Sequence, residues 1–150
     1  MKVQRTITVN KPMPQVMEYL RDFSHTQDWD PGTVRCERID VGPTDVGPIA
    51  VGSRWKNVSQ FMGRTVELEY RLERAEPDRL TFAGHNASAR ATDDLRFEPH
   101  DGGTLIVYSA DIQFRGAARL AAPFLKPAFN RLADEVAASM PSAIDASALD

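Results

Sequence analysis

The chain has 150 residues and a mass of 16.7 kDa, which is the size of one globular domain. Hydrophobic residues make up 42% and charged residues 26%, so the composition excludes a disordered or fibrous protein. The net charge of −3, without a run of Lys or Arg, argues against a nucleic acid or an anionic membrane as partner. No apolar stretch approaches the roughly 20 residues of a membrane span, and the N-terminus has no signal-peptide core. We therefore expect a cytoplasmic protein without integral membrane association.

The chain begins with alternating polar and apolar residues over 3–9, which predicts a β-strand. A helix is expected to open at Lys11, because the prolines that follow are tolerated in a first turn. A second, short helix is expected from Ser24, with Ser24 and Gln27 forming a capping box. The sequence Asp30-Pro31-Gly32 then ends this helix.

The central part of the chain has the pattern of a β-sheet. Short turn sequences such as Met62-Gly63 and Asp101-Gly102-Gly103 join the strands, so consecutive strands must be antiparallel. The predicted strands cover residues 33–41, 51–61, 64–75, 79–85, 88–98 and 104–114.

The last element differs from the rest. Apolar residues recur at i+4 spacing from Gly116 to Met140, which predicts a long amphipathic helix. Pro123 and Pro127 lie inside it, so we expect a late start or a kink. The small, acidic end at 141–150 is expected to be a disordered tail, which leaves a single domain over residues 1–140. The fold class is therefore α+β, in the order β-α-α-β6-α, with a seven-stranded antiparallel sheet that curves around the long helix to bury both apolar faces.

Three local sequences add a resemblance to this pattern: Asp28-Trp29-Asp30-Pro31-Gly32-Thr33-Val34, Val51-Gly52-Ser53-Arg54-Trp55 and Gly103-Thr104. With the order of elements, they resemble the helix-grip fold of the SRPBCC superfamily, which includes START domains, the birch-pollen allergen and polyketide cyclase/dehydrase-type members. The resemblance covers roughly residues 2–140. It implies a cavity between sheet and long helix that takes a hydrophobic or aromatic ligand, lipid-like or polyketide-like.

Hairpin geometry identifies the side chains that face this cavity, because directly paired residues share a face of the sheet. With the turn at Met62-Gly63, Ser59 pairs with Val66, and the same face carries the alternate residues further along both strands. Applied to each strand, with Trp29 as a gate at the rim and Phe124 closing the cavity from the helix, this predicts a ligand site. Its residues are Trp29, Trp55, Asn57, Ser59, Leu68, Tyr70, Phe82, Asp93, Tyr108 and Phe124.

A few polar groups in an apolar lining are typical of a small-molecule site. The alternative is that the aromatic residues are ordinary core, and that Asn57 and Ser59 bond each other or the backbone. Asp93 fits the apolar inner face least well, because a carboxylate in such surroundings must be paired, hydrated or protonated. Either Asp93 faces inward, where it could act as a base, or a β-bulge at Asp93-Asp94 turns its side chain outward.

Three functions fit these observations. The first is a binding protein for a hydrophobic or aromatic small molecule. The second is a cyclase or aromatase-type enzyme with Asp93 and Tyr108 as catalytic residues. The third is a protein-interaction module. The His and Cys positions lack metal-ligand spacing, and nucleotide-binding motifs are missing, so we expect neither a metal nor a cofactor.

Overall fold

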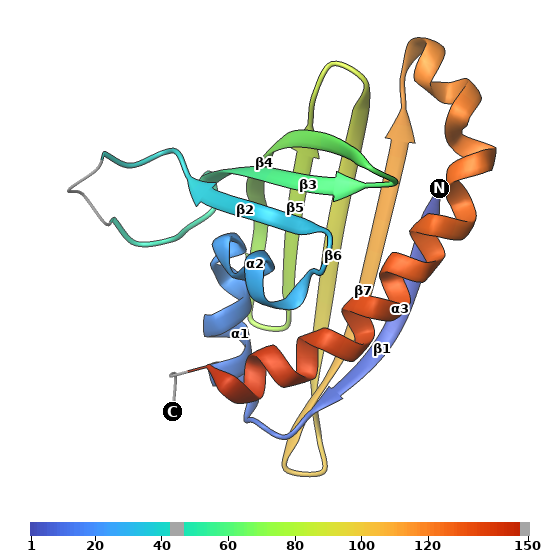
Figure 1. The fold of residues 1–150 in the computed structure, drawn as a ribbon. Helices are drawn as coiled ribbons and strands as arrows, with labels where there is room; N and C mark the ends of the chain where they lie inside the picture. Colours follow the sequence, from blue (N-terminus) through green and yellow to red (C-terminus); the bar gives the residue numbers. More distant parts are fainter. Residues whose placement is uncertain (43–46, 148–150) are drawn as a thin grey trace.

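The computed structural model describes residues 1–42 and 47–147. The sheet contains seven antiparallel strands in the spatial order β1-β7-β6-β5-β4-β3-β2. It curves around the helices, and α3 runs across its open side (Figure 1). The predicted α+β helix-grip architecture and the order β-α-α-β6-α are confirmed. The elements are β1 (Lys2–Val9), α1 (Met13–Arg21), the 3₁₀ turn η1 (Phe23–His25), α2 (Thr26–Trp29), β2 (Thr33–Arg38), β3 (Arg54–Phe61), β4 (Arg64–Glu76), β5 (Arg79–His85), β6 (Ala89–His100), β7 (Gly103–Phe114), the 3₁₀ turn η2 (Gly116–Ala121) and α3 (Ala122–Ala146).

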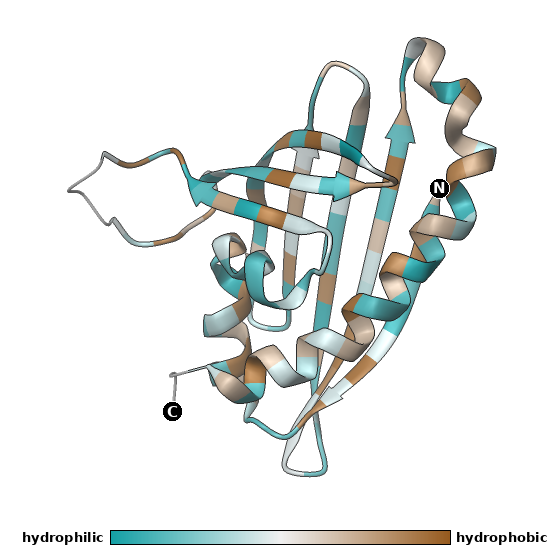
Figure 2. Cartoon of the chain, viewed as in Figure 1, coloured by the Kyte–Doolittle hydropathy of each residue, from teal (hydrophilic) through white to brown (hydrophobic). Residues whose placement is uncertain are grey.

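Two tight turns fix the register of the sheet. Met62 and Gly63, between β3 and β4, both have positive φ, as do Asp101 and Gly102 between β6 and β7. Positive φ at both central residues is the hairpin geometry that matches the twist of the strands. The pairing Ser59↔Val66 that follows is the predicted one. Figure 2 shows the resulting alternation of hydrophilic and hydrophobic residues along the strands.

The short helical segment after α1 is capped differently from the prediction. Asp22 Oδ1 accepts hydrogen bonds from the Ser24 amide (3.0 Å) and the Ser24 hydroxyl (2.7 Å). Gln27 Nε2 donates to the Ser24 carbonyl (3.0 Å), so the Ser24–Gln27 capping box does not form. The carboxylate of Asp22 is the stronger acceptor and takes the orphan donors at this helix start.

The C-terminal helix starts late and ends late. The 3₁₀ turn η2 precedes it, so the expected late start near Pro123 is confirmed. The expectation of a disordered tail from 141 is wrong for residues 141–146, which are helical. The reason is burial, because Met140 and Ile144 are completely buried and anchor the last turns to the core. Residues 148–150 of the predicted tail lie outside the described residues.

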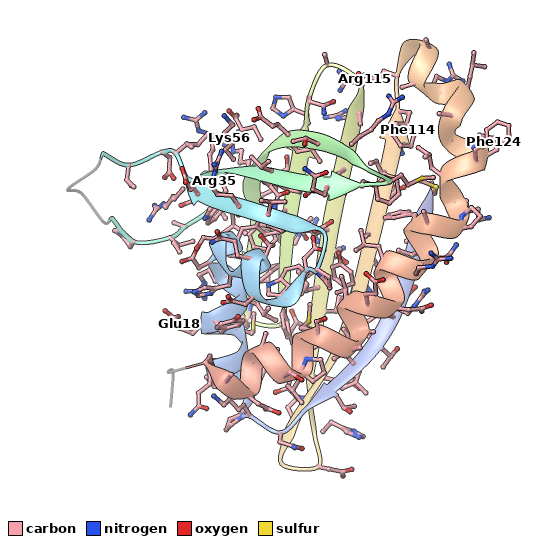
Figure 3. All side chains as sticks on the ribbon, in the orientation of Figure 1. Glu18, Arg35, Lys56, Phe114, Arg115 and Phe124 are labelled. Atoms are coloured by element: carbon pink, nitrogen blue, oxygen red, sulfur yellow. The ribbon has the colours of Figure 1, made fainter. Side chains whose placement is uncertain are left out.

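The two halves of α3 have different surroundings. Its buried residues, from Ala133 to Ile144, lie between the middle of the helix and its C-terminal end, where α3 packs against β1 and α2. Phe124 in the N-terminal half is 79% exposed and projects away from the sheet (Figure 3). The prediction that Phe124 closes a cavity is therefore wrong. The apolar spacing of the helix continues beyond the part that has a sheet to pack against.

Candidate functional site

The predicted pairing of the inner face is confirmed along its length. Trp55 pairs with Tyr70, Asn57 with Leu68, Phe82 with Asp93, and Leu95 with Tyr108. Three residues of the inner face are only half-buried: Ser59 on β3, Val66 on β4 and Ile112 on β7. The side chains of the inner face are thus buried near α1 and α2 (the closed end) and only half-buried toward the β3–β4 turn. The predicted residues of this face that are buried are Trp55, Asn57, Leu68, Tyr70, Phe82, Asp93 and Tyr108.

Phe23, in η1, occupies the centre of the closed end. Its ring centroid lies 4.5 Å from those of Tyr70 and Phe82, 6.1 Å from that of Trp55 and 6.3 Å from that of Trp29. These are contact distances for aromatic rings. The sequence pattern does not identify Phe23 as part of this face, because helical spacing assigns it only to the apolar stripe of the first helix.

Trp29 lies in the interior and not at a rim. It is 2% exposed, and its ring stands at 77° to that of Tyr108, with 5.9 Å between the ring centroids. The expected position of Trp29 as a gate at the rim is therefore wrong, because α2 directs the indole inward against the rings of Phe23 and Tyr108. Trp29 Nε1 is buried and has no hydrogen-bond partner within residues 1–42 and 47–147. An unpaired N–H in an apolar interior is costly, so this donor requires an explanation.

Tyr70 owes its position to a glycine on the neighbouring strand. Gly84 is its direct partner on β5, and a Cβ added at Gly84 would lie 2.8 Å from the Tyr70 ring. Such a distance is too short for a non-bonded carbon contact. The missing side chain lets the phenol lie flat over β5, within reach of the charges of Asp93 and Asp30.

Asn57 and Ser59 bond each other, which is one of the alternatives that the sequence leaves open. The Ser59 hydroxyl donates to Asn57 Oδ1 (2.5 Å). Asn57 Nδ2 donates to Thr33 Oγ1 (3.1 Å) and to Thr26 Oγ1 (3.3 Å). Trp55 is fixed in a similar way, since its Nε1 donates to Asp22 Oδ1 (3.2 Å). These bonds tie β3 to β2 and to the helical segment, and they hold the closed end together.

Asp93 faces inward. The register of β6 with both neighbouring strands is continuous at Asp93 and Asp94, so the alternative of a β-bulge is wrong. Asp93 is 8% exposed, whereas Asp94 points to the other face, where Arg79 Nε donates to its Oδ1 (2.8 Å). Two adjacent carboxylates thus have opposite environments, one apolar and one paired with a cation.

Asp93 lies in a cluster of acids and phenols. Burial raises the pKa of Asp93 to about 8, the negative charge of Asp30 adds to the rise, and a side-chain hydrogen bond with Tyr108 opposes it. Burial also raises the phenol pKa of Tyr70 and of Tyr108 well above the usual value. At pH 7 Asp93 is therefore mostly protonated, and both phenols are protonated as well.

Asp30 is an acid near the site that the sequence pattern does not assign to it. The sequence pattern assigns it only to a helix stop, but its carboxylate accepts from the Gly32 amide (2.9 Å) and the Thr33 hydroxyl (3.0 Å). Burial raises the pKa of Asp30, these two bonds lower it, and the charge of Glu135 on α3 raises it. The signal that could have identified it is the Asp-x-Gly-Thr turn, whose bonds hold the carboxylate in a fixed orientation.

A hollow of about 590 Å³ lies on the opposite, outer face of the sheet. Its lining is strongly polar and includes Arg54, Arg71, Arg90 and Arg115, so it is separate from the predicted inner site. Arg115 is visible at the end of β7 in Figure 3.

Among the described residues, no cluster of three or more His, Cys, Asp or Glu is placed to hold a metal ion. None of the described helices combines the length and apolarity needed to cross a membrane.

A curled seven-stranded sheet closed by a long C-terminal helix, with an aromatic inner face, defines the helix-grip class. Residues 1–144 match the family described as polyketide cyclase / dehydrase and lipid transport, and the chain belongs to this family. Among curated proteins, none matches the sequence.

Several solved structures share the fold at low sequence identity. A protein from Thermus thermophilus is 14% identical with a TM-score of 0.79, over 99% of both chains. The Zhui aromatase/cyclase from a Streptomyces species is 17% identical with a TM-score of 0.77, over 97% of this chain and 93% of that one. A START superfamily protein from Mycobacterium smegmatis is 15% identical with a TM-score of 0.74, over 96% of this chain and 97% of that one. At these identities the likeness shows the fold alone.

Proposed function

We propose that this protein binds a hydrophobic or aromatic small molecule on the inner face of the sheet, between the sheet and α3. The observation that carries the proposal is the buried group of Asp93, Tyr70 and Tyr108 within an aromatic lining, with the half-buried Asp30 acting on it by its charge. A core that serves only stability would gain by replacing these polar groups with apolar ones of similar volume. The family, whose description includes lipid transport, supports the same interpretation.

The ligand is proposed to enter from the partly open end, where Ser59, Val66 and Ile112 are half-buried. Phe114 ends the last strand at this end (Figure 3). Beyond this entrance, the apolar floor of the proposed site is formed by Trp29, Trp55, Leu68 and Phe82. Asp93 and Tyr108 offer polar contacts there.

Binding can be tested with the neutral fluorescent probe N-phenyl-1-naphthylamine, together with native mass spectrometry of the freshly purified protein. We expect saturable binding of one probe per chain, accompanied by quenching of tryptophan fluorescence. Val66→Trp should fill the entrance and weaken binding at least about tenfold, because it removes the space that the probe occupies. Glu67→Trp is the matched control, since Glu67 is the next residue along β4 and faces the outer side. Absence of saturable binding, or equal loss in both variants, would contradict the proposal.

A second candidate function is a proton-transfer enzyme of the cyclase or aromatase type. It is favoured by the inward position of Asp93 beside Tyr108 and by the raised pKa of about 8. In this proposal ionised Asp93 takes a proton from the carbon next to a ketone, while the Tyr108 hydroxyl donates to the ketone oxygen, so that an enol forms. The enol then takes a proton back at a different carbon or attacks a second carbonyl. Either step regenerates the Asp93 carboxylate and the Tyr108 hydroxyl.

This candidate can be tested by the exchange of α-protons of 1-tetralone for deuterium, followed by NMR in deuterated buffer. We expect the catalysed rate to rise as the pH passes through about 8, because Asp93 acts as a base only when it is ionised. Asp93→Asn should lower this rate by roughly two to four orders of magnitude. Asp94→Asn is the control, because Asp94 lies on the outer face. Exchange no faster than in buffer would leave the binding function alone.

A further inference from the structure

Hydrogen-bond donors gather at one place on the inner face. Trp29 Nε1 is buried and unpaired among the described residues, and its ring packs against Tyr108. Tyr108 on β7 is the diagonal neighbour of Asp93 on the same face of the sheet and lowers the pKa of Asp93, and Tyr70 lies within range of the charges of Asp93 and Asp30. When Asp93 is protonated, four side chains have a proton to donate here: Trp29, Tyr70, Asp93 and Tyr108.

The charges around this place are negative. Asp30, in the turn before β2, raises the pKa of Asp93 by its charge, and Glu135 on α3 acts on Asp30 in the same way. Among the described residues, no cation contributes to the pKa of Asp93. Arg5 is the basic residue of β1 directly opposite Tyr108, but its side chain turns to α3. There Arg5 Nε donates to Asp134 Oδ1 (2.8 Å) and Nη2 donates to the Asn130 carbonyl (3.2 Å).

We propose that the inner site selects ligands whose polar group is a neutral hydrogen-bond acceptor, a carbonyl or a hydroxyl, and that it rejects carboxylates. This inference rests on the proposed binding function and adds the chemical class of the ligand. A carboxylate would stand next to Asp30 without a counter-ion in an apolar interior, which is strongly unfavourable. An ammonium group has no lone pair to accept from Trp29 or Asp93, so it leaves these donors unpaired.

The selection has a defined dependence on pH. Below about pH 8 Asp93 carries its proton and can donate to the ligand. Above this pH it becomes a second carboxylate beside Asp30, and it then competes with the ligand for the Tyr108 hydroxyl. Affinity for a neutral acceptor should therefore fall as the pH rises through 8, and the phenols remain protonated across this range.

Three probes with the same aromatic body test the proposal: 9-anthracenemethanol, 9-anthracenecarboxylate and 9-(aminomethyl)anthracene. Fluorescence anisotropy at pH 6.5 should show the alcohol binding about tenfold or more tightly than either charged probe. Affinity for the alcohol should fall severalfold between pH 6.5 and pH 9. Asp93→Asn keeps a donor but cannot titrate, so it should flatten this pH dependence, whereas the outer-face control Asp94→Asn should not. Trp29→Phe removes the N–H together with part of the indole ring, and it should weaken the alcohol severalfold.

The outcomes are distinct. Equal or tighter binding of the carboxylate or the amine would overturn the selection while leaving the binding function in place. A pH dependence that persists in Asp93→Asn would overturn the role given to Asp93. Failure of all three probes to bind would overturn the proposed function, and this inference with it.

Discussion

Replacing Asp93 by asparagine is expected to stabilise the folded protein by about 4 kcal/mol at pH 7. The ordinary pKa of 3.8 for an aspartate is raised to about 8 at this position, chiefly by burial. Folding at neutral pH therefore requires Asp93 to take up a proton that the unfolded chain has released. Asparagine has nearly the same shape and needs no proton, so this cost disappears. Equilibrium urea unfolding, followed by tryptophan fluorescence, measures the difference.

The sign of the pH dependence distinguishes this cause from others. Between about pH 4 and pH 8 the folded protein holds one more proton at Asp93 than the unfolded chain, so the contribution of this group to stability falls as pH rises. The advantage of Asp93→Asn should thus be small near pH 4 and reach its maximum above pH 8. Asp94→Asn should act in the opposite direction, because Asp94 pairs with Arg79. A constant advantage at all pH values would argue against a titrating Asp93.

Such a result would bear on function as well as on stability. A residue that costs several kcal/mol at its own position contributes something other than folding. Asp93→Asn would then be more stable, yet its binding would lose its dependence on pH and any proton transfer would be lost. A gain in stability with unchanged behaviour in all binding and exchange measurements would indicate a carboxylate without a role at the site.

The sequence is sufficient to predict the inner face of the sheet in this protein. Two turns, at Met62-Gly63 and Asp101-Gly102, set the register, and strict alternation then places Asp93 and Tyr108 inward. A register shift of one residue would have moved every side chain to the wrong face. The inward orientation of Asp93 follows from the same rule, even though its polarity left a bulge at Asp93-Asp94 as the alternative.

Residues outside the sheet were harder to predict, because helical spacing does not show where the partner surface ends. Phe124 continues the apolar spacing of α3 but lies beyond the packed half of the helix, while Ile144, assigned to a tail, is buried. Phe23 and Asp30 reach the site through the path of a short helical segment and a turn. Their positions depend on tertiary contacts, which a single sequence pattern does not contain.

Replacing Trp29 by alanine is expected to cost about 3–5 kcal/mol of stability. Trp29 is 2% exposed, and its ring contacts Phe23 on one side and Tyr108 on the other. Removing it would leave a cavity at the closed end, where the hydrogen bonds of Asn57 and Trp55 hold β3 against the helical segment and limit collapse. Urea unfolding followed by circular dichroism measures the loss without depending on the tryptophan that is removed.

Phe124→Ala is the control for Trp29→Ala, since both substitutions delete an aromatic ring that the sequence assigned to the ligand site. Phe124 is 79% exposed, so its loss should cost less than about 0.5 kcal/mol. If Trp29 instead gated an entrance, Trp29→Ala would cost less than about 1 kcal/mol and would mainly speed the exchange of N-phenyl-1-naphthylamine. A large loss from Phe124→Ala would show that the N-terminal half of α3 packs on the sheet in solution. A large loss from Trp29→Ala alone places the closed end of the site at α2 and leaves the end near the β3–β4 turn as the way in.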